Sequence, residues 1–575
     1  MKYVVVLALT GVIAALTLAS ASFSGAATGP RAFYVSPSGD DRNPGTSRAR
    51  PWKTIARVNG GSYRAGDRIL LEGGKSFTGT FVFSPKNARG SATSPVTVSS
   101  YGKGRATIAS PNGLLARDVA GLRITKLRFA GRRPASGGSG IAFLNLGKAK
   151  LAGIHVSDVE VSGYTNSILI YAVKPPAQYR GVRIERVSVH DNAQGPVLFG
   201  WLGRASTLDN NRFGLEDIVV REMQSFRNTG AGLKNGYGAG LVVLNADRVA
   251  IERNVIHDNG GANPEQTPNG PSGITVYDAR NLLVQENEVY RQRFDVKNQT
   301  DNSGMDIWAR DAVIQYNYVH DNEGWGFVFG SSDPKVTGPG ISWLSSDITM
   351  RYNVAENNGR PLPKSEAQIK YSFASILMFG QIERFEIYNN TFFRSGVTTV
   401  SHPDLLQGMI YLVDVPGVGR PWANVHLRNN VFVTEGDLVP IEVPRPTAGR
   451  DLRLEGNAYI ALGGQSTIKW GDLSYRIADW TAATGQETVA GRPTAIIAGP
   501  DALCAAGQGR TMFPRGLRAL GAYRLRGDSP LVDRALDLRA SAVKVGPRDY
   551  FGNPVPAGNG FDVGAHEYRA GESCG

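Results

Sequence analysis

Long apolar runs are scarce in this sequence. The one clear run, Tyr3–Leu18, follows the basic residue Lys2 and precedes the small residues Ala19-Ser20-Ala21. This order is typical of a secretory signal peptide, and the run is short for a membrane-spanning helix. We therefore predict a signal peptide over residues 1–21, with cleavage as late as residue 27 as the alternative. The mature protein is then secreted, with no membrane partner.

Cysteine is also scarce, because Cys504 and Cys574 are the only two in 575 residues. A metal site built on cysteine would need further ligands nearby. Both cysteines lie in the last 75 residues of a chain that we expect to be exported. Cysteines of exported proteins usually pair, so we predict one disulfide between Cys504 and Cys574 that holds the C-terminus.

Dense runs of lysine or arginine are missing, although the formal net charge is +13. Removing Lys2 with the signal peptide leaves 13 − 1 = +12. A basic charge that is spread over the whole chain favours an anionic partner without favouring nucleic acid. We therefore expect an anionic polysaccharide as the substrate, no nucleic-acid partner, and a monomer.

Low-complexity segments are missing as well, although the sequence holds 70 glycines and 31 prolines. Turn-forming residues that are spread through a long chain are typical of many short strands joined by tight turns. The composition therefore indicates a strand-rich protein.

A repeat runs through most of the chain. One asparagine recurs at intervals of 27 to 40 residues, each time inside a segment of alternating apolar residues; it stands at Asn254, Asn287, Asn317, Asn353, Asn390, Asn430 and Asn457. Each unit also holds a second strand that begins with glycine or serine. A unit of this size cannot bury its own apolar face, so the units must stack as a β-solenoid. Stacking would place the asparagines in a ladder with a spacing of about 4.8 Å.

These repeats, together with the N-terminal segment Phe33–Gly74 and the closing motif "NGFDVGAHEY", resemble the right-handed parallel β-helix proteins of the pectate-lyase-like superfamily, in its carbohydrate-active branch. The resemblance implies an all-β fold, a single-stranded right-handed parallel β-helix with a capping segment at each end. We place the N-terminal cap at residues 31–115, the repeats at 116–460 and the C-terminal cap at 461–575. A short helix is expected within Leu473–Thr488.

Three histidines invite a catalytic interpretation. His190, His257 and His320 each open a His-Asp-Asn triplet at one position of the repeat. In other units that position holds Phe226 or Tyr290. A residue that is set by the repeat period is more often part of the scaffold than a catalyst, so we interpret the histidines and the aspartates after them as structural.

Asp306 departs from the repeat. Strand alternation places it on the outer face, because a buried unpaired charge would be costly. Tyr277 and Trp308 share that face one unit apart, which predicts an aromatic ledge for sugar binding unless another chain segment covers it. The longest insertions, at 260–271, 291–302, 331–343 and 359–371, flank this ledge, and they bring Arg291 and Arg293 towards it as further substrate-binding residues.

The main functional hypothesis is a polysaccharide lyase that acts on uronate by β-elimination. The stretch Asp301–Asp306 resembles the calcium-binding motif of some β-helix pectate lyases, which implies calcium held by Asp301 and Asp306 with Asp278. The segment ending at Lys234 resembles the one that carries their lysine base. Elimination needs the carboxylate neutralised and a base for the proton, roles open to Lys234 and Arg310. Calcium is the only cofactor expected.

Two alternatives remain. A glycoside hydrolase would use a pair of carboxylates, Asp306 with Asp278 or Asp301, and would need no metal. Asp278 and Asp306 lie in adjacent units, so they would face each other at the spacing of retaining enzymes. A non-catalytic protein that binds glycan or cell wall would use Tyr277 and Trp308 without an acid pair.

Overall fold

The computed structural model describes residues 29–132, 134–201, 212–233, 237–262, 271–293, 302–331, 345–359, 374–380, 382–395, 408–413, 422–436, 438–446, 451–509 and 520–574. The predicted signal peptide, Lys234 and Asp301 lie outside these residues, as does most of each long insertion.

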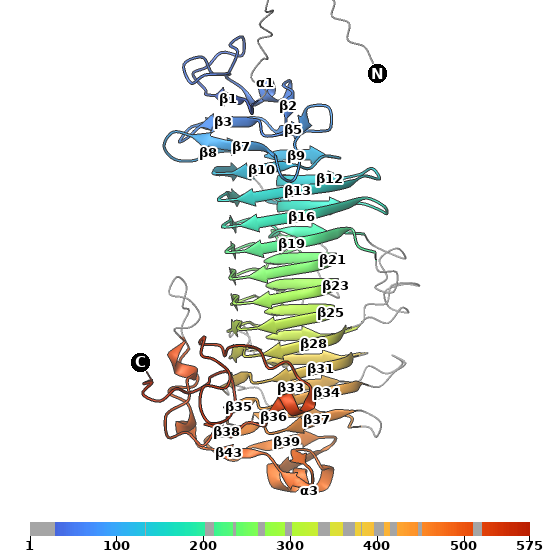
Figure 1. Ribbon diagram of the computed structural model, residues 1–575, viewed down its shortest axis with the longest axis vertical. Helices are drawn as coiled ribbons and strands as arrows, with labels where there is room; N and C mark the ends of the chain where they lie inside the picture. The colour runs from blue at the N-terminus through green and yellow to red at the C-terminus, as the bar shows by residue number, and fades with distance from the viewer. Residues whose placement is uncertain are drawn as a thin grey trace, which may run out of the picture.

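The described chain winds into an elongated parallel β-helix, with successive coils stacked along the long axis (Figure 1). Two long sheets run along this axis, one of 25 strands and one of 14. Within the coils each strand pairs in parallel with the strand one coil further on, as in β21–β23 and β23–β25. The predicted all-β solenoid is confirmed.

The large sheet contains β1 (Ala32–Val35), β3 (Arg68–Glu72), β5 (Phe81–Phe83), β7 (Val96–Tyr101), β9 (Leu114–Arg117), β10 (Leu122–Thr125), β12 (Ser139–Asn145), β13 (Lys150–Ser157), β15 (Asn166–Ala172), β16 (Gln178–Glu185), β18 (Val197–Phe199), β19 (Leu215–Arg221), β21 (Leu241–Glu252), β23 (Ile274–Gln285), β25 (Met305–Gln315), β27 (Phe327–Phe329), β28 (Ser345–Arg351), β30 (Ile376–Phe379), β31 (Ile382–Tyr388), β33 (Gly408–Val413), β34 (Ala423–Arg428), β36 (Val439–Val443), β37 (Leu452–Glu455), β39 (Thr467–Trp470) and β40 (Leu473–Arg476). The small sheet contains β4 (Ser76–Phe77), β8 (Ala106–Ala109), β11 (Leu127–Ala130), β14 (Glu160–Ser162), β17 (Ser188–His190), β20 (Gln224–Phe226), β22 (Val255–His257), β24 (Glu288–Tyr290), β26 (Tyr318–His320), β29 (Val354–Glu356), β32 (Thr391–Arg394), β35 (Val431–Glu435), β38 (Ala458–Leu462) and β43 (Ile496–Ala498). The helices are α1 (Ile55–Asn59) and α3 (Ile477–Thr484), with short 3-10 turns at η1 (Pro134–Ser136), η4 (Pro500–Ala502), η6 (Gly521–Tyr523) and η7 (Leu538–Ser541), and two small pairings join β2 (Tyr63–Arg64) to β6 (Ala88–Arg89) and β41 (Thr488–Val489) to β42 (Arg492–Pro493).

The solenoid interior is a single column of apolar side chains. In β21, for example, Leu241, Val243, Val249 and Ile251 are all buried in the main core cluster. The residues between them point outwards, as strand alternation requires. At the N-terminal end, β1 pairs with β3 and α1 buries Ile55 and Val58, so the first coil is covered.

The recurring asparagines form the predicted ladder. Asn254 donates from Nδ2 to Oδ1 of Asn287 at 2.8 Å, and Asn287 donates in turn to Asn317 at 3.0 Å. The same bond continues through Asn353, Asn390, Asn430 and Asn457. Each amide also bonds a backbone carbonyl, so these buried groups are satisfied.

The histidine column is scaffold, as predicted. Its rings stack face to face along the small sheet, with centroids 4.8 to 5.1 Å apart, in the order His190, Phe226, His257, Tyr290 and His320. Each histidine bonds from Nδ1 to the aspartate that follows it, and these aspartates adopt the left-handed turn conformation. The triplets therefore shape a turn.

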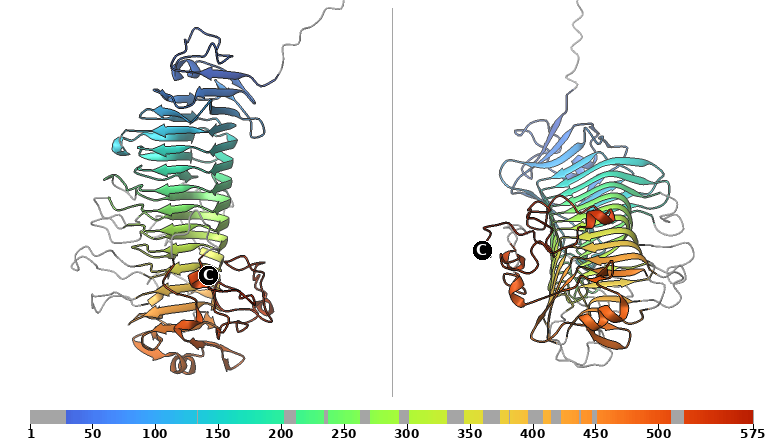
Figure 2. Two further views of the ribbon diagram at one scale, coloured as in Figure 1. Left: turned by 90° about the vertical axis from the view of Figure 1, so that its left-hand side faces the viewer. Right: turned by 60° about the horizontal axis from the view of Figure 1, so that its bottom comes forward.

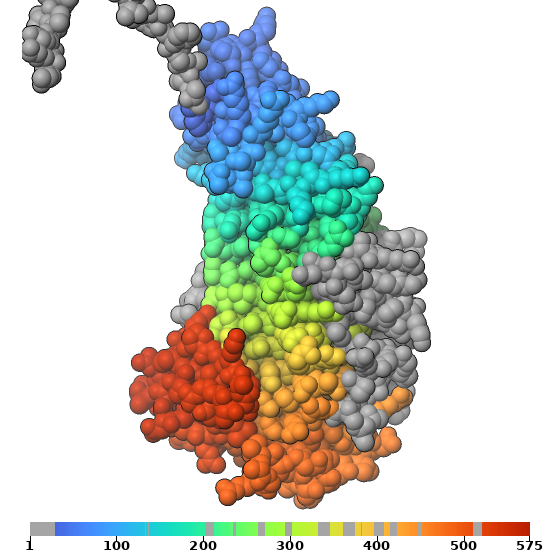
Figure 3. Space-filling view, turned by 45° about the vertical axis from the view of Figure 1, so that its right-hand side comes forward, coloured from blue at the N-terminus to red at the C-terminus, as the bar shows by residue number. Residues whose placement is uncertain are grey.

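The C-terminal segment folds back over the outer face of the small sheet. The phenol of Tyr316 donates to the carbonyl of Arg548 at 2.9 Å, and that of Tyr388 donates to the carbonyl of Lys544 at 2.7 Å. Figures 2 and 3 show this segment as a lobe against the lower part of the column. The predicted helix is confirmed as α3. No helix among the described residues is long and apolar enough to cross a membrane.

The predicted disulfide is confirmed, because Cys504 and Cys574 are bonded to each other across 70 residues of sequence. Closing a loop of that length removes about 4 kcal/mol of conformational freedom from the unfolded segment. We expect that replacing both cysteines with serine destabilises the C-terminal lobe more than the coils. Limited proteolysis should then cut within residues 499–574 first, with the coils still intact. Equal resistance in the wild type and the variant would contradict this expectation.

Candidate active site

The sequence-predicted ledge is assembled on the outer face of the large sheet. Met305, Ile307 and Ala309 of β25 point into the core, so Asp306 and Trp308 face outwards. Trp308 lies in register with Tyr277 of the previous coil, and their ring centroids are 4.8 Å apart. The Tyr277 hydroxyl donates a hydrogen bond to Oδ2 of Asp306. One carboxylate and two aromatic rings therefore meet here.

The ledge is not an open surface, however. Asp306 is only 3% exposed and Tyr277 only 8% exposed. The ring of Phe379, from β30 two coils further on, packs edge-on against Trp308 with a centroid distance of 5.6 Å. Tyr277 and Asp306 are therefore covered, as the alternative expected, whereas Trp308 stays partly exposed.

Asp278 lies at a corner of the coil. It follows Tyr277 in β23 and adopts a left-handed backbone with φ 53°, a conformation that aspartate and asparagine tolerate better than most residues. Asn245 occupies the equivalent corner of β21, also with φ 53°. The next strand, β25, has no counterpart, because the register shifts between Tyr277 and Ala279. Asp278 is therefore the last residue of its corner column.

This corner alters the predicted relation between the two carboxylates. Asp306 lies opposite Thr275, not opposite Asp278. Asp278 comes three residues after Thr275, an offset of roughly 10 Å along the strand at about 3.3 Å per residue. The expectation that Asp278 and Asp306 face each other across adjacent coils is therefore wrong at the level of the backbone.

A buried amide fixes the orientation of the Asp278 carboxyl. Oδ1 of Asn245 accepts hydrogen bonds from the backbone N–H groups of Trp201 at 3.0 Å and Gly214 at 2.7 Å. Its Nδ2 must therefore point the other way, where it donates to Oδ2 of Asp278 at 2.7 Å. The flipped amide would set Nδ2 against two N–H donors.

The surroundings of Asp278 favour its neutral form. Asp278 is 2% exposed, and burial raises the pKa of its carboxyl to about 7, although the Asn245 hydrogen bond and the Arg310 charge act to lower it. Because Oδ2 accepts from Asn245, the proton of the neutral acid resides on Oδ1. Within the described part of the chain, Oδ1 has no hydrogen-bond partner. The corner thus holds an acid whose proton is not engaged by these residues.

Arg310 is close enough to Asp278 for its charge to act on it, so the structure brings this pair together. It lies in register with Arg280 of the previous coil and Ser346 of the next. Arg280 in turn donates to Asp247 at 3.1 Å. Two arginines of successive coils therefore lie near Asp278.

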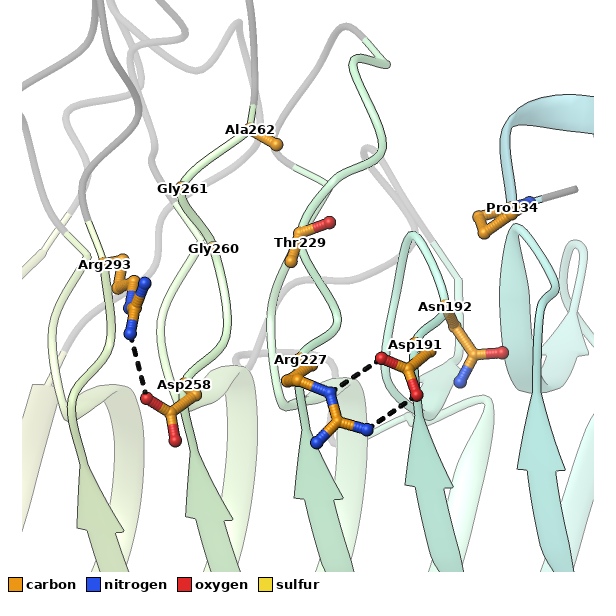
Figure 4. Close-up of a pocket in the computed structure, with 10 residues that line it drawn as sticks. All are labelled: Pro134, Asp191, Asn192, Arg227, Thr229, Asp258, Gly260, Gly261, Ala262 and Arg293. Atoms are coloured by element: carbon orange, nitrogen blue, oxygen red, sulfur yellow. Dashed lines mark hydrogen bonds and ion pairs between the residues drawn. The ribbon is translucent and has the colours of Figure 1, made fainter.

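The structure places Arg291 and Arg293 at the turn that follows β24 of the small sheet. Figure 4 shows Arg293 there beside Asp258. Arg291 donates to both carboxylate oxygens of Asp258, at 2.9 and 2.7 Å, and lies over the ring of Tyr290. Arg293 makes one longer bond to Asp258, at 3.4 Å. The prediction that these arginines join the ledge is therefore wrong for their described positions, because turn aspartates pair with them.

The predicted calcium ligands cannot be tested together, since Asp301 lies outside the described residues. Among the residues that are described, no group of three or more His, Cys, Asp or Glu side chains could hold a metal ion. The calcium site stays a prediction, as does the role of Lys234.

Comparison with known protein families agrees with the observed architecture. Residues 222–432 match a family model described as a right handed beta helix region. This chain is a right-handed parallel β-helix protein.

Relatives of this β-helix protein include a lacto-N-biosidase of Bifidobacterium longum subsp. longum. The two are 24% identical over 456 aligned residues, which cover 60% of this chain and 28% of the relative. The chain thus spans less than a third of the length of that curated relative. Among solved structures, a GH136 lacto-N-biosidase from Eubacterium ramulus is 17% identical with a TM-score of 0.48, covering 69% of this chain and 67% of the other. The pectate lyase Pel9A is 12% identical with a TM-score of 0.33, covering 94% and 96%.

Asn245 is the residue of this site that sequence reasoning missed. A signal for it exists in the β-helix repeats themselves. Ala246 follows Gly240 by six positions and Ala279 follows Gly273 by six positions, but Ala309 follows Gly304 by only five. The extra residue in the first two coils is Asn245 or Asp278, and its loss from the third leaves Asp278 at the end of the column.

Replacing Asn245 with aspartate should redirect the proton of Asp278. One oxygen of the new carboxylate would still accept hydrogen bonds from the backbone N–H groups of Trp201 and Gly214. Its other oxygen would face Oδ2 of Asp278, so the proton of Asp278 would lie on Oδ2 and be donated to the new carboxylate. We expect kcat to fall about tenfold or more. The alkaline limb of the pH profile should move to higher pH, because an adjacent negative charge raises the pKa of Asp278.

Asn281→Asp is the matched control for this change. Asn281 donates to Asp247 of the previous coil at 2.8 Å, so the same chemical change faces a different aspartate. It should leave the alkaline limb in place. If Asn245→Asp folds normally and shifts no limb, Asn245 has only a structural role.

Proposed function

We propose that this β-helix protein is a glycoside hydrolase that acts on an oligosaccharide or polysaccharide outside the cell. Asp278 is the general acid and Asp306 is the second carboxylate, beside the rings of Tyr277 and Trp308. The sequence leaves a glycoside hydrolase as the alternative to a polysaccharide lyase. The relative named lacto-N-biosidase favours the hydrolase.

The observation that carries the proposal is the buried carboxyl group of Asp278. Burial raises the pKa of Asp278 to about 7, so this group keeps a proton to give to a leaving group at neutral pH. Asp306 lies on the next coil, where its Oδ2 accepts a hydrogen bond from the Tyr277 hydroxyl. A protonated carboxyl group together with a second carboxyl group is the usual basis of glycosidase acid–base roles.

Extracellular action is supported by the predicted signal peptide and by the disulfide between Cys504 and Cys574. The basic net charge of the chain supports a substrate with an acidic unit. Both points concern where and on what the enzyme acts, and neither bears on the choice between hydrolysis and elimination.

The test is a panel of neutral and acidic glycans incubated with the purified protein, with and without a chelator. We expect new reducing ends without the ultraviolet absorbance of unsaturated uronate, and no effect of the chelator. Absorbance that rises with the reducing ends would establish a lyase instead, and its loss with chelator would implicate calcium. If no glycan of the panel yields either signal but glycan binding is retained, the result would favour a non-catalytic module.

The anomeric configuration of the first product discriminates the possible carboxylate pairs. The offset of roughly 10 Å between Asp278 and Asp306 is nearer to the spacing of inverting pairs, about 6.5 to 9.5 Å, than to the roughly 5 to 5.5 Å of retaining pairs, so we expect inversion. Retention would shift the acid role to Asp301, the other partner considered for Asp306. In either case Asp306→Ala should abolish turnover, and full turnover by that variant would show that the site is elsewhere.

A further inference from the structure

A groove lies along the turn that follows β17, β20, β22 and β24, on four consecutive coils. Its cavity volume is about 640 Å³, within the usual range for ligand pockets. Figure 4 shows charged side chains of the turn below and the backbone of Gly260 and Gly261 above. The lining residues used here are Asp191, Arg227, Thr229, Asp258, Gly260 and Arg293.

Asp258 has no capacity left for a further donor. A carboxylate offers about four acceptor positions. Nδ1 of His257 takes one at 2.7 Å, and Nε and Nη2 of Arg291 take two at 2.9 and 2.7 Å. Arg293 reaches the same carboxylate with Nη2 only, at 3.4 Å. Most donors of the half-exposed Arg293 guanidinium are thus unused within the described residues.

Arg227 also has hydrogen-bond donors that the described residues do not use. Its Nε and Nη2 bond the two oxygens of Asp191 at 2.7 and 2.8 Å, which leaves the N–H groups of Nη1 without a partner among the described residues. Asp191 accepts a third bond from Nδ1 of His190, at 2.7 Å. One acceptor position of Asp191 therefore remains beside the spare donors of Arg227.

The lining charges of the groove balance, because Arg227 and Arg293 face Asp191 and Asp258 and the sum is 2 − 2 = 0. The spare N–H donors of the two arginines suit a ligand with a single negative charge. The two aspartates disfavour a dianion such as a phosphate monoester, whereas the spare acceptor of Asp191 and the Thr229 hydroxyl suit hydroxyl groups.

We propose that this groove binds a sugar residue that carries one carboxylate, a uronic acid unit, with the carboxylate on Arg293 and a hydroxyl group beside Nη1 of Arg227. The choice of a sugar as the ligand rests on the proposed function. The site lies on the turn beside the active-site strand, because the side-chain amide of Asn302 donates to the carbonyl of Arg293 and Asn302 precedes Asp306 by four residues. An acidic unit bound here is a remote part of the glycan that the enzyme recognises.

Binding of methyl β-D-glucuronide and methyl β-D-glucoside, measured by saturation-transfer NMR and calorimetry on the full chain, tests this site. The glucuronide should bind at least ~10-fold more tightly than the glucoside, and more weakly at high salt. Arg293→Gln should raise the Kd for the glucuronide ~10-fold or more, since it removes the charge and the spare donors that hold the carboxylate. Equal affinity for the two glycosides would overturn the proposal.

Arg253→Gln is the matched control. Arg253 is a turn residue that pairs with Glu222 and Glu286 along the other edge of the small sheet. It should leave the Kd unchanged, and an equal loss in both variants would reduce the effect to net charge and overturn the site. Inorganic phosphate should compete poorly; displacement of the glucuronide at equal concentration would assign the groove to a general anion.

Turnover and binding are separate readouts in this design. Binding to the Asp306→Ala variant, which cannot turn over substrate if the proposed function is correct, should equal that of the wild type. Glucuronide binding without any hydrolysis would leave the groove assigned and refute the hydrolase. Hydrolysis without glucuronide binding would refute the groove alone.

Discussion

Replacing Asp278 with asparagine is expected to lower kcat by about 10²- to 10⁴-fold at pH 6, the usual contribution of a general acid. Asparagine has nearly the same shape and can still accept the hydrogen bond from Asn245, so the corner should keep its structure. What is lost is the proton on Oδ1. Steady-state kinetics with the best substrate from the glycan panel, together with thermal unfolding of the variant, measure both parts of the prediction.

The pH dependence of the wild type follows from the same residue. The acid is active when protonated, and burial raises the pKa of Asp278 to about 7. The part of kcat that depends on Asp278 should therefore be maximal below that pKa and fall about tenfold per pH unit above it. In Asp278→Asn this alkaline limb should disappear along with most of the activity.

Asp217→Asn is a suitable control for Asp278→Asn. Asp217 shares the left-handed turn conformation, but it is partly exposed and pairs with Arg180 and Arg248 at the surface. Losing such a pair usually costs little. This variant should keep both the rate and the alkaline limb. Unchanged turnover in Asp278→Asn would instead remove Asp278 from the mechanism and return the acid role to Asp301.

The sequence predicts the scaffold well because the scaffold repeats. The Asn254 ladder and the ring column of His257 depend only on the repeat period and on strand alternation. The sequence of one coil therefore predicts the structure of the next. The turn arginines carry a similar signal. Asp258 and Arg291 are successive members of one alternating turn column, and this indicates an ion pair along the axis.

The burial of the site could not be predicted in the same way. Asp306 is covered although its strand position is outward, and part of that environment comes from Phe379, whose coil is more than 70 residues later. The position of Asp278 depends on one extra residue in its coil, which shifts register without changing the apolar pattern. Both effects depend on how neighbouring coils pack against each other, and the alternation of residues within one strand does not predict that packing.

The C-terminal lobe should lose stability as pH rises from about 5 to about 9, with Glu567 as the main cause. Its side chain is 0% exposed, and its oxygens accept from the backbone N–H groups of Ala557 and Asp562. Burial, reinforced by the negative charges of Asp562 and Asp549, raises the pKa of Glu567 from 4.5 to about 8. Burial likewise raises the pKa values of Asp549 and Asp562 to about 6.

The sign of this dependence follows from proton uptake. Between pH 4.5 and 8 the folded lobe holds the Glu567 proton, whereas the unfolded segment has released it. The stabilisation is therefore fully present below the unfolded pKa and is lost as pH rises through the folded pKa. A shift of about 3.5 units corresponds to about 5 kcal/mol at about 1.4 kcal/mol per unit, which is large against the stability of a typical domain.

Glu567→Gln should flatten this pH dependence, because glutamine stays neutral throughout. Hydrogen exchange of residues 520–574 and thermal unfolding at pH 5, 7 and 9 would measure it. At pH 9 the variant lobe should be more stable than the wild type, even though glutamine replaces one acceptor oxygen with a donor and so weakens one backbone bond at every pH. Glu435→Gln, at an exposed strand end, should keep the wild-type slope. If the wild-type lobe is equally stable at pH 5 and pH 9, Glu567 must be ionised in the folded state and compensated by partners other than these backbone N–H groups.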